Sequence, residues 1–367
     1  MVTDVVVVGG GIVGLTAALR LRQEGLDVTV LDAGGPGAGA SPQAAGVLAP
    51  LLDQAKPEPL LAMLIDAAAR WPRWLEEWDD AGTAPTLRHG VLVVAETAFH
   101  LTELRQLERL AQAVDKDARL LDAAQVRQAV PGTAASVQGG LFYPGAAWLD
   151  ARSLYRSLVA RCLAAGVRIR WGTPAVGFER RGTRVRGVRL MGEIVPGGAV
   201  ILAAGAWSGL LLASVGGRLP IVPVRGILAE IEGVPVPPWP VFGRTHHVVP
   251  RPDGTVLVGG VEEQAGFAAH VTTRALRRVL EGQDLYPPLA DGVIRGQGAG
   301  LRPRTPDGLP CLGWWPGLDG LFVAAGHFRN GILLAPLTAE IVAAAVTGAE
   351  VPMDLGPFRP HRFEEAP

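Results

Sequence analysis

The beginning of the chain alternates short apolar runs with one amphipathic segment. Residues 4–8 end in four valines, a run typical of a strand buried on both faces. Residues 12–24 place apolar side chains three and four positions apart, which predicts a helix, and Gly25 is a natural stop. Residues 28–31 form a second apolar run that ends at Asp32. The pattern therefore predicts a strand, a helix and a second strand within about 30 residues.

The hydrophobic pattern also predicts elements through the rest of the chain. Helices are expected over residues 60–80, 101–113, 122–129, 151–165 and 273–282, and from Asn330 to near Val346. Strands are expected over residues 90–95, 139–143, 167–171, 185–190, 193–195 and 200–204. Asp150 is placed to cap the helix that starts at Ala151, and Gly166 to end it.

Between residues 218 and 295 the pattern changes to alternating apolar and polar positions. Strands are expected over residues 224–231, 245–250 and 256–261, and a Pro-Asp-Gly turn joins the last two. Such alternation is typical of an antiparallel sheet with one buried face. The predicted fold class is therefore α/β, with a Rossmann-like dinucleotide-binding domain assembled from separated segments and an inserted antiparallel-sheet (α+β) substrate domain.

The predicted domain boundaries follow this change of pattern. The dinucleotide-binding domain is expected to comprise residues 1–86, 149–215 and 298–367, and the substrate-binding domain residues 87–148 and 216–297. Residues 199–217 carry no charge over 19 positions, close to the length of a membrane helix. Glycines interrupt this stretch and its first six residues resemble a buried strand, so no membrane span is expected.

Composition limits the classes of function. The net charge is −1 with Lys and Arg scattered singly, which argues against nucleic-acid binding, because that needs a clustered basic patch. The two cysteines, Cys162 and Cys311, cannot form a disulfide framework, and a cytoplasmic location fits them. No metal site is expected, because His246 and His247 are adjacent on a predicted strand and would point to opposite faces.

Gly9, Gly11 and Gly14 form a G-x-G-x-x-G motif directly after the first predicted strand. Glycines at this spacing permit a tight turn, a close approach of the backbone to a pyrophosphate, and packing of the helix on the sheet. The helix N-terminus favours the phosphate charge, and Asp32 is placed to accept hydrogen bonds from ribose hydroxyls. The motif fits both FAD and NAD, whereas an acid at Asp32 disfavours the 2′-phosphate of NADP.

Two segments far from this motif carry further candidate chemistry. Residues 326–336 stand at the predicted start of the last helix, whose N-terminus would stabilise a developing negative charge. Arg302 follows residues 296–300, a glycine-rich stretch that predicts a turn. Arginine binds a carboxylate through two parallel hydrogen bonds, and a structural salt bridge is the alternative role for Arg302.

Five motifs carry a resemblance to a known family: residues 9–14, 40–48, 203–208, 300–303 and 326–336. With them the chain resembles the D-amino-acid oxidase superfamily of flavoproteins, and within it is most similar to the glycine oxidases of thiamine biosynthesis. The last motif is the most specific, while the others are shared more broadly across the superfamily.

The resemblance implies a non-covalently bound FAD. It implies cofactor contacts at Gly9, Gly11, Ile12, Val13, Gly14, Asp32, Ala33, Ala40, Ser41, Ala45, Gly46, Val47 and Val176, and near the reactive ring at Gly326, His327, Phe328, Arg329, Asn330, Gly331, Ile332 and Leu333. Val176 would contact the adenine through its backbone. Some sarcosine-oxidising relatives tether the flavin to a cysteine, but Cys311 does not match that pattern.

The same resemblance implies the substrate contacts. Arg302 would bind the substrate carboxylate, and Arg329 would add a positive field over the ring or the substrate. The glycine oxidases carry a tyrosine where this chain has His247. His247 is expected either to face the pocket, which would change its size and hydrogen bonding, or to lie on the strand surface.

The implied reaction is oxidative deamination of glycine or another small amino acid. The Cα hydrogen would pass as hydride to flavin N5, the imine would hydrolyse to an α-keto acid and ammonia, and oxygen would be reduced to hydrogen peroxide. In the thiazole-forming context the imine itself would be handed on. A D-amino-acid or sarcosine oxidase or dehydrogenase, and a flavin-binding subunit without turnover, are the alternatives. Exposed sheet edges leave a homo-oligomer open.

Overall fold

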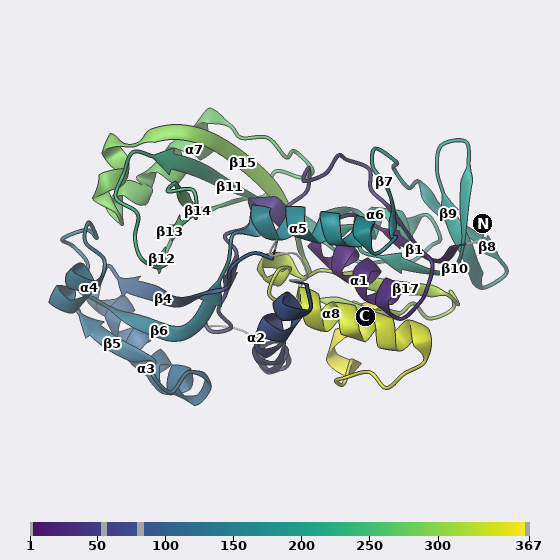
Figure 1. The fold of residues 1–367 in the computed structure, drawn as a ribbon, viewed down its shortest axis with the longest axis horizontal. Helices are drawn as coiled ribbons and strands as arrows, with labels where there is room; N and C mark the ends of the chain where they lie inside the picture. The colour runs from purple at the N-terminus through teal and green to yellow at the C-terminus, as the bar shows by residue number, and fades with distance from the viewer. Residues whose placement is uncertain (1–2, 53–56, 79–83, 364–367) are drawn as a thin grey trace.

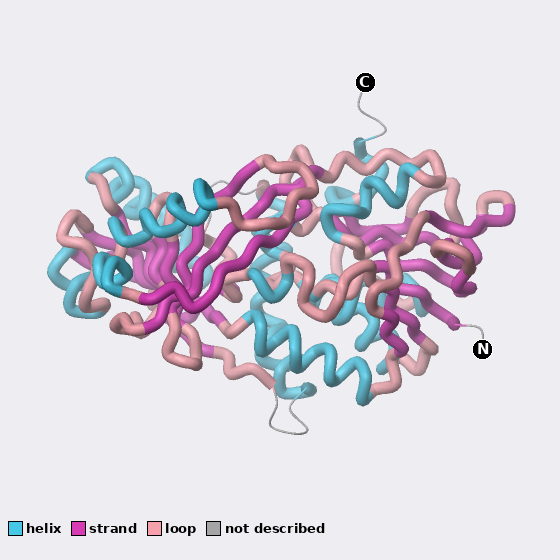
Figure 2. Tube along the Cα trace, turned by 90° about the horizontal axis from the view of Figure 1, so that it is seen from above, coloured by secondary structure: helices cyan, strands magenta, loops and turns pink. Residues whose placement is uncertain are grey.

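The computed structural model describes residues 3–52, 57–78 and 84–363, and its strands form two sheets. Figure 1 shows one sheet at each end of the elongated molecule, with helices packed between them. In Figure 2 the same two groups of strands stand apart when the molecule is seen from above. The chain passes between the two sheets several times, so both are assembled from segments that are distant in the sequence.

The first sheet has the strand that precedes the glycine motif near its centre. Its order is β16 (Cys311–Trp314), β17 (Leu321–Ala325), β10 (Ile194–Leu202), β1 (Thr3–Val8), β2 (Val28–Leu31) and β7 (Arg168–Arg170), and β8 (Gly177–Arg181) and β9 (Arg184–Arg189) extend it from β10. The strands from β17 to β7 run parallel, and Val7 is aligned with both Ile201 and Val30. This arrangement confirms the Rossmann-like sheet built from separated segments.

Helices bury one face of this sheet. The helices are α1 (Ile12–Gln23), α5 (Ala151–Ala164) and α8 (Ala335–Thr347), and α2 (Glu58–Trp78) packs against α8. Three tryptophans of α2 are almost fully buried, and Trp74 Nε1 donates to Glu340 Oε1 at 2.9 Å, which ties α2 to α8. The β8–β9 hairpin and α6 (Ser208–Ala213) cover the other face.

The second sheet is the predicted antiparallel one, apart from its parallel pair β12–β4. Its order is β15 (Val293–Arg304), β11 (Val222–Glu232), β14 (Val256–Glu263), β13 (His247–Pro250), β12 (Val241–Phe242), β4 (Arg88–Ala95), β6 (Gly139–Trp148) and β3 (Val47–Leu48), with β5 (Arg119–Asp122) on β6. Helices α3 (Ala98–Val114), α4 (Ala123–Ala129) and α7 (Thr273–Leu280) pack on it.

The predicted turn over residues 296–300 is wrong, because these residues lie inside strand β15. The glycines there mark close backbone packing instead of a turn. A Cβ atom on Gly298 would lie 2.0 Å from Gln43 Oε1, and one on Gly300 would lie 2.9 Å from Ala40 Cα. The boundary at residues 297 and 298 falls within this strand, and the domain division remains a prediction.

The predicted start of the last helix at Asn330 is also wrong. Residues 328–330 form a short 3-10 helix, η5 (Phe328–Asn330), and α8 begins at Ala335 with Pro336 in its first turn. Proline lacks an N–H and has the φ of a helix start, so it favours this position. The predicted strands 193–195 and 200–204 belong to one strand, β10.

The structure also bears on the end of the helix predicted over residues 60–80 and on the expectation of no membrane span. The helix expected to reach Asp80 is helical as far as Trp78, and residues 79 and 80 lie outside the described residues. Within residues 3–52, 57–78 and 84–363, no helix has the length and apolar character needed to cross a membrane.

Candidate functional site

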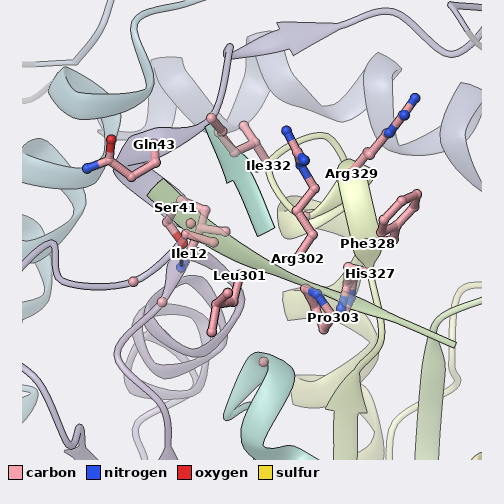
Figure 3. A pocket seen from close by; sticks show the side chains of 18 of the residues that line it. Ile12, Ser41, Gln43, Leu301, Arg302, Pro303, His327, Phe328, Arg329 and Ile332 are labelled. Carbon is pink, nitrogen blue, oxygen red and sulfur yellow. Dashed lines mark hydrogen bonds between the residues drawn. The ribbon is translucent and has the colours of Figure 1, made fainter. Parts of the chain in front are cut away.

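A cavity of about 1480 Å³ collects the predicted site residues from separated segments. Its wall includes the glycine motif, residues 38–47, residues 300–303 and residues 327–333. Figure 3 shows Ile12 and Ser41 on one side of this pocket, and Arg302, Arg329 and Ile332 on the other. All of the predicted site residues line the cavity except Gly14 and Gly326, which pack behind its wall.

Gly9 and Gly14 are fixed by close backbone packing at the turn between β1 and α1. Gly9 has φ +115°, and a Cβ atom there would lie 2.3 Å from Ala203 O. A Cβ atom on Gly14 would lie 1.9 Å from Gly9 O. No larger residue fits either position without a backbone shift, which explains why the sequence motif requires glycine there.

Asp32 holds this turn from the end of β2. Its Oδ2 accepts from the N–H of Gly10 at 2.6 Å, and its Oδ1 accepts from the N–H of Gly34 at 2.8 Å. The carboxylate lines the cavity and has lone pairs beyond these two bonds, so it can still accept from a ribose hydroxyl.

Two side chains support the N-terminus of α1. Ser41, in the 3-10 helix η1 (Ser41–Gln43), accepts from the Ile12 N–H at 2.9 Å through Oγ. Tyr155 of α5 donates to Gly10 O at 2.8 Å, and burial raises the pKa of its phenol to about 12, so it remains a donor. Sequence reasoning missed Tyr155, because no local motif distinguishes it from the other core residues of its helix.

The residues at this end fit FAD. A Cβ atom on Gly11 would meet only Ser41 Oγ, at 3.4 Å, so the backbone there faces open space in which a pyrophosphate can approach the helix N-terminus. The N–H of Val176 already donates to Arg189 O at 2.8 Å. An adenine contact through the Val176 backbone would therefore use its carbonyl group.

The opposite end of the cavity contains a strained turn. Phe328 has φ +50° and is the one non-glycine residue with positive φ among the described residues. The guanidinium carbons of Arg304 and Arg329 lie 5.5 Å and 5.4 Å from the centroid of the Phe328 ring. Strain of this kind is found at ligand sites and persists only where surrounding contacts enforce it.

His327 sits behind this turn as a neutral, buried side chain. It is 4% exposed, and its Nε2 lies 3.1 Å from Thr338 Oγ1 of α8. Burial lowers its pKa to about 4. The ring therefore fixes the turn to α8, and His327 also lines the cavity.

His327 gives a pH prediction. The unfolded chain binds a proton near pH 6.5 and the folded state only near pH 4, so stability is present above pH 6.5 and is lost as pH falls toward 4. The full effect corresponds to about 3 kcal/mol. Chemical unfolding of wild type and His327→Gln between about pH 7 and about pH 4 should show a weaker pH dependence in the variant. Equal dependence would contradict this assignment.

Arg302 lies on β15 with its guanidinium over Gly226 of β11. A Cβ atom on Gly226 would lie 2.3 Å from Arg302 Nη1 and 2.4 Å from Nη2, so the glycine creates the space that the guanidinium occupies. Neither Gly226 nor its role was predicted, because the sequence does not reveal which strands pair.

Glu262 of β14 is a second residue that sequence reasoning missed. Its Oε1 lies 3.3 Å from Arg302 Nη1 and accepts from Arg329 Nε at 2.8 Å. Burial alone would raise the pKa of the Glu262 carboxyl, but the hydrogen bond and charge of Arg329 and the charge of Arg302 lower it below its usual value. An ionised carboxylate therefore lies against both predicted substrate arginines.

His247 faces the same cavity. Its ring stacks on Phe242 with centroids 5.1 Å apart, and a Cβ atom on Gly259 would lie 2.5 Å from its Nε2. Burial, followed by the charges of Arg302 and Arg329, lowers its pKa to about 3, so the ring is neutral. His246 precedes strand β13, and its Nε2 lies 2.8 Å from Arg278 O.

Helix α3 also contributes to the wall of the cavity, through His100, Glu103 and Leu107. His100 is 5% exposed, and its Nδ1 has no hydrogen-bond partner among the described residues. Burial lowers the pKa of His100, so a neutral ring lines this part of the cavity. The cavity therefore reaches α3 as well as the predicted cofactor and substrate residues.

The support of Arg302 by Gly226 is testable. In Gly226→Ala the new methyl group should displace the guanidinium without disrupting the backbone, because the clash is with the end of a flexible side chain. We expect a loss of about 100-fold in kcat/KM, typical of a misplaced binding group. Gly296→Ala is the control, since its Cβ atom would have ordinary contacts at 3.5 Å with Glu230. Equal activities of the two variants would refute the proposed support.

Comparisons with known proteins find a matching family and similar sequences. The family model described as "FAD dependent oxidoreductase" matches residues 4–345. The chain is 33% identical to glycine oxidase of Pseudomonas aeruginosa, covering 97% of this chain and 98% of that protein. It is 32% identical to bifunctional protein ThiO/ThiG of Trichormus variabilis, covering 100% of this chain but 56% of that protein, so the chain spans about half of its length.

The fold has a similar solved structure. The crystal structure of glycine oxidase from Geobacillus kaustophilus matches with a TM-score of 0.93 and 30% identity, covering 98% of both chains. The two-sheet arrangement therefore belongs to a fold already observed by experiment.

Proposed function

Because the chain belongs to the family of FAD-dependent oxidoreductases, we propose that this enzyme catalyses oxidative deamination of glycine or another small amino acid. The observation that carries the proposal is the Arg302 guanidinium, which is held over Gly226 at the wall of the cavity. Arginine pairs with a carboxylate through two parallel hydrogen bonds, so Arg302 can fix an amino acid by its α-carboxylate.

The residues of the chain would bind and orient the substrate. When bound, FAD supplies a hydride acceptor for the Cα hydrogen. Arg302 would hold the carboxylate, and neutral His247 would offer a hydrogen-bonding group in place of the family's tyrosine. Fixing Cα in one orientation supplies much of the rate in reactions of this kind. The imine product would hydrolyse to an α-keto acid and ammonia, with oxygen reduced to hydrogen peroxide.

We infer that the FAD is held non-covalently. Cys311 does not line the cavity, and its Sγ accepts from Arg362 Nη1 at 3.4 Å. Burial raises the pKa of the Cys311 thiol to about 11 and that of the Cys162 thiol to about 12, which leaves both as poor nucleophiles. Acid precipitation should release all of the flavin into the supernatant.

The alternative function is oxidation or dehydrogenation of D-amino acids or sarcosine at the same site. The space beside His100, Glu103 and Leu107 favours this alternative, because a side chain or N-methyl group would need it. Initial rates of ammonia and hydrogen peroxide formation should be compared for glycine, sarcosine and several D-amino acids. A highest kcat/KM for glycine supports the first proposal. No turnover with any amine would leave a flavin-binding subunit as the explanation.

We also propose a cellular role in thiamine biosynthesis. The similarity to bifunctional protein ThiO/ThiG and the resemblance to glycine oxidases of thiamine biosynthesis support a role in forming the thiazole of thiamine. Deletion of the gene should make growth depend on added thiamine. The intact gene should restore growth without thiamine, and an Arg302→Leu copy should not. A cytoplasmic location and a homo-oligomer remain predictions.

A further inference from the structure

We propose that Glu262 restricts the substrate site to amino acids that carry one carboxylate, by occupying the position beside Arg329 that a second carboxylate would take. This inference rests on the proposed function, because it assumes that Arg302 binds the α-carboxylate.

The sheet places Glu262 beside the substrate-binding guanidinium. Gly226 of β11 is paired with Glu262 of β14 on one side, and the Arg302 guanidinium lies over Gly226 itself. Glu262 is the cross-strand neighbour of the glycine that supports Arg302. Its position therefore follows from the strand register and not from a mobile loop.

One oxygen of Glu262 contacts both arginines. Oε1 lies 2.8 Å from Arg329 Nε and 3.3 Å from Arg302 Nη1. The shorter contact is of the length expected for a charge-assisted hydrogen bond, and the longer one exceeds it. A substrate carboxylate can therefore replace Glu262 on Arg302 while Glu262 stays on Arg329.

This arrangement makes the site selective by charge. The α-carboxylate approaches Arg302, and the ammonium group of the same amino acid meets a neighbouring carboxylate of opposite charge. A second carboxylate on the ligand would approach Arg329 and would lie against Glu262. Like charges at such distances repel each other strongly in a half-buried site. Glu262 therefore weakens the binding of ligands that carry a second carboxylate.

Acetate and malonate form a matched pair of probes, because they differ by one carboxylate. Their dissociation constants should be measured on the FAD-bound protein by calorimetry and by perturbation of the flavin spectrum, at about pH 8, where both malonate carboxyls are ionised. We expect wild type to bind acetate more tightly than malonate. In Glu262→Gln the ratio of the malonate dissociation constant to the acetate dissociation constant should fall by about 10-fold or more.

Glu232→Gln is the control variant. Glu232 is exposed on β11, away from the cavity, and its loss removes the same charge from the protein. Its malonate-to-acetate ratio should equal that of wild type. An unchanged ratio in Glu262→Gln, or an equal fall in Glu232→Gln, would overturn the inference.

The wild-type measurement decides the question even if Glu262→Gln does not fold. Malonate binding as tight as acetate binding in wild type would overturn the inference directly. The failure of the proposed function looks different: acetate would not bind at all and no amine would reduce the flavin. Reduction by glycine together with equal binding of both probes would leave the proposed function standing and remove the selectivity assigned to Glu262.

Discussion

Replacing Arg302 with leucine should lower kcat/KM for the amino-acid substrate, with a loss of about 2–5 kcal/mol in transition-state stabilisation, the range for removing one partner of a buried charge pair. This corresponds to a loss of about 30-fold to about 5000-fold. The physical reason is that the substrate carboxylate would leave water without gaining two hydrogen bonds from the guanidinium. Steady-state peroxide formation measures the loss in kcat/KM, and the dissociation constant of acetate measures the loss of carboxylate binding.

Arg295→Leu is the matched control for this prediction. Arg295 lies on the same strand as Arg302, but its side chain is 52% exposed and lies near Glu232 and Asp253. Its removal should leave kcat/KM close to the wild-type value, because exposed ion pairs contribute little. Similar kinetics in Arg302→Leu and wild type would show that the carboxylate binds elsewhere.

Replacing Gly11 with valine should give a folded protein that lacks FAD. The Cβ position of Gly11 points into open space beside Ser41 Oγ, so the side chain meets no backbone. The valine would instead fill the space through which the pyrophosphate reaches the first N–H groups of α1. Flavin content per protein molecule should fall to near zero, while circular dichroism should retain the helix content of wild type.

Gln23→Ala tests whether loss of flavin is specific to the motif. Gln23 is exposed at the far end of the same helix, where alanine favours helix formation. This variant should bind as much FAD as wild type. A yellow Gly11→Val protein with full flavin content would refute the pyrophosphate role of the glycine motif.

The sequence revealed those parts of the site whose chemistry requires fixed residues at fixed spacing. Gly9 and Gly14 have no room for a side chain, and this steric requirement is visible as a motif. The parallel strands on either side of the motif were also predictable, because a strand buried on both faces leaves an unbroken apolar run.

The sequence concealed the parts that depend on strand pairing. Glu262 lies near Arg302 only because β14 and β15 both pair with β11. Gly226 and Gly259 look like any other strand glycines until the register places Arg302 and His247 against them. No local pattern in residues 222–263 specifies that register.

Two of the errors in secondary structure have related causes. The glycines of β15 were interpreted as turn residues, whereas they permit close contact with residues 40–43. The start of α8 was predicted five residues early, because Asn330-Gly331 is typical of turns and helix starts alike, and the turn at η5 precedes the helix. In both cases tertiary packing decided between local conformations that the sequence allows.

Anaerobic addition of glycine to the purified protein tests the central claim most directly. The visible absorption band of oxidised flavin should disappear rapidly, because hydride transfer from glycine Cα reduces the cofactor in the absence of oxygen. Loss of this band would establish bound flavin and glycine oxidation together. A yellow protein that glycine, sarcosine and D-amino acids all leave unchanged would contradict the account.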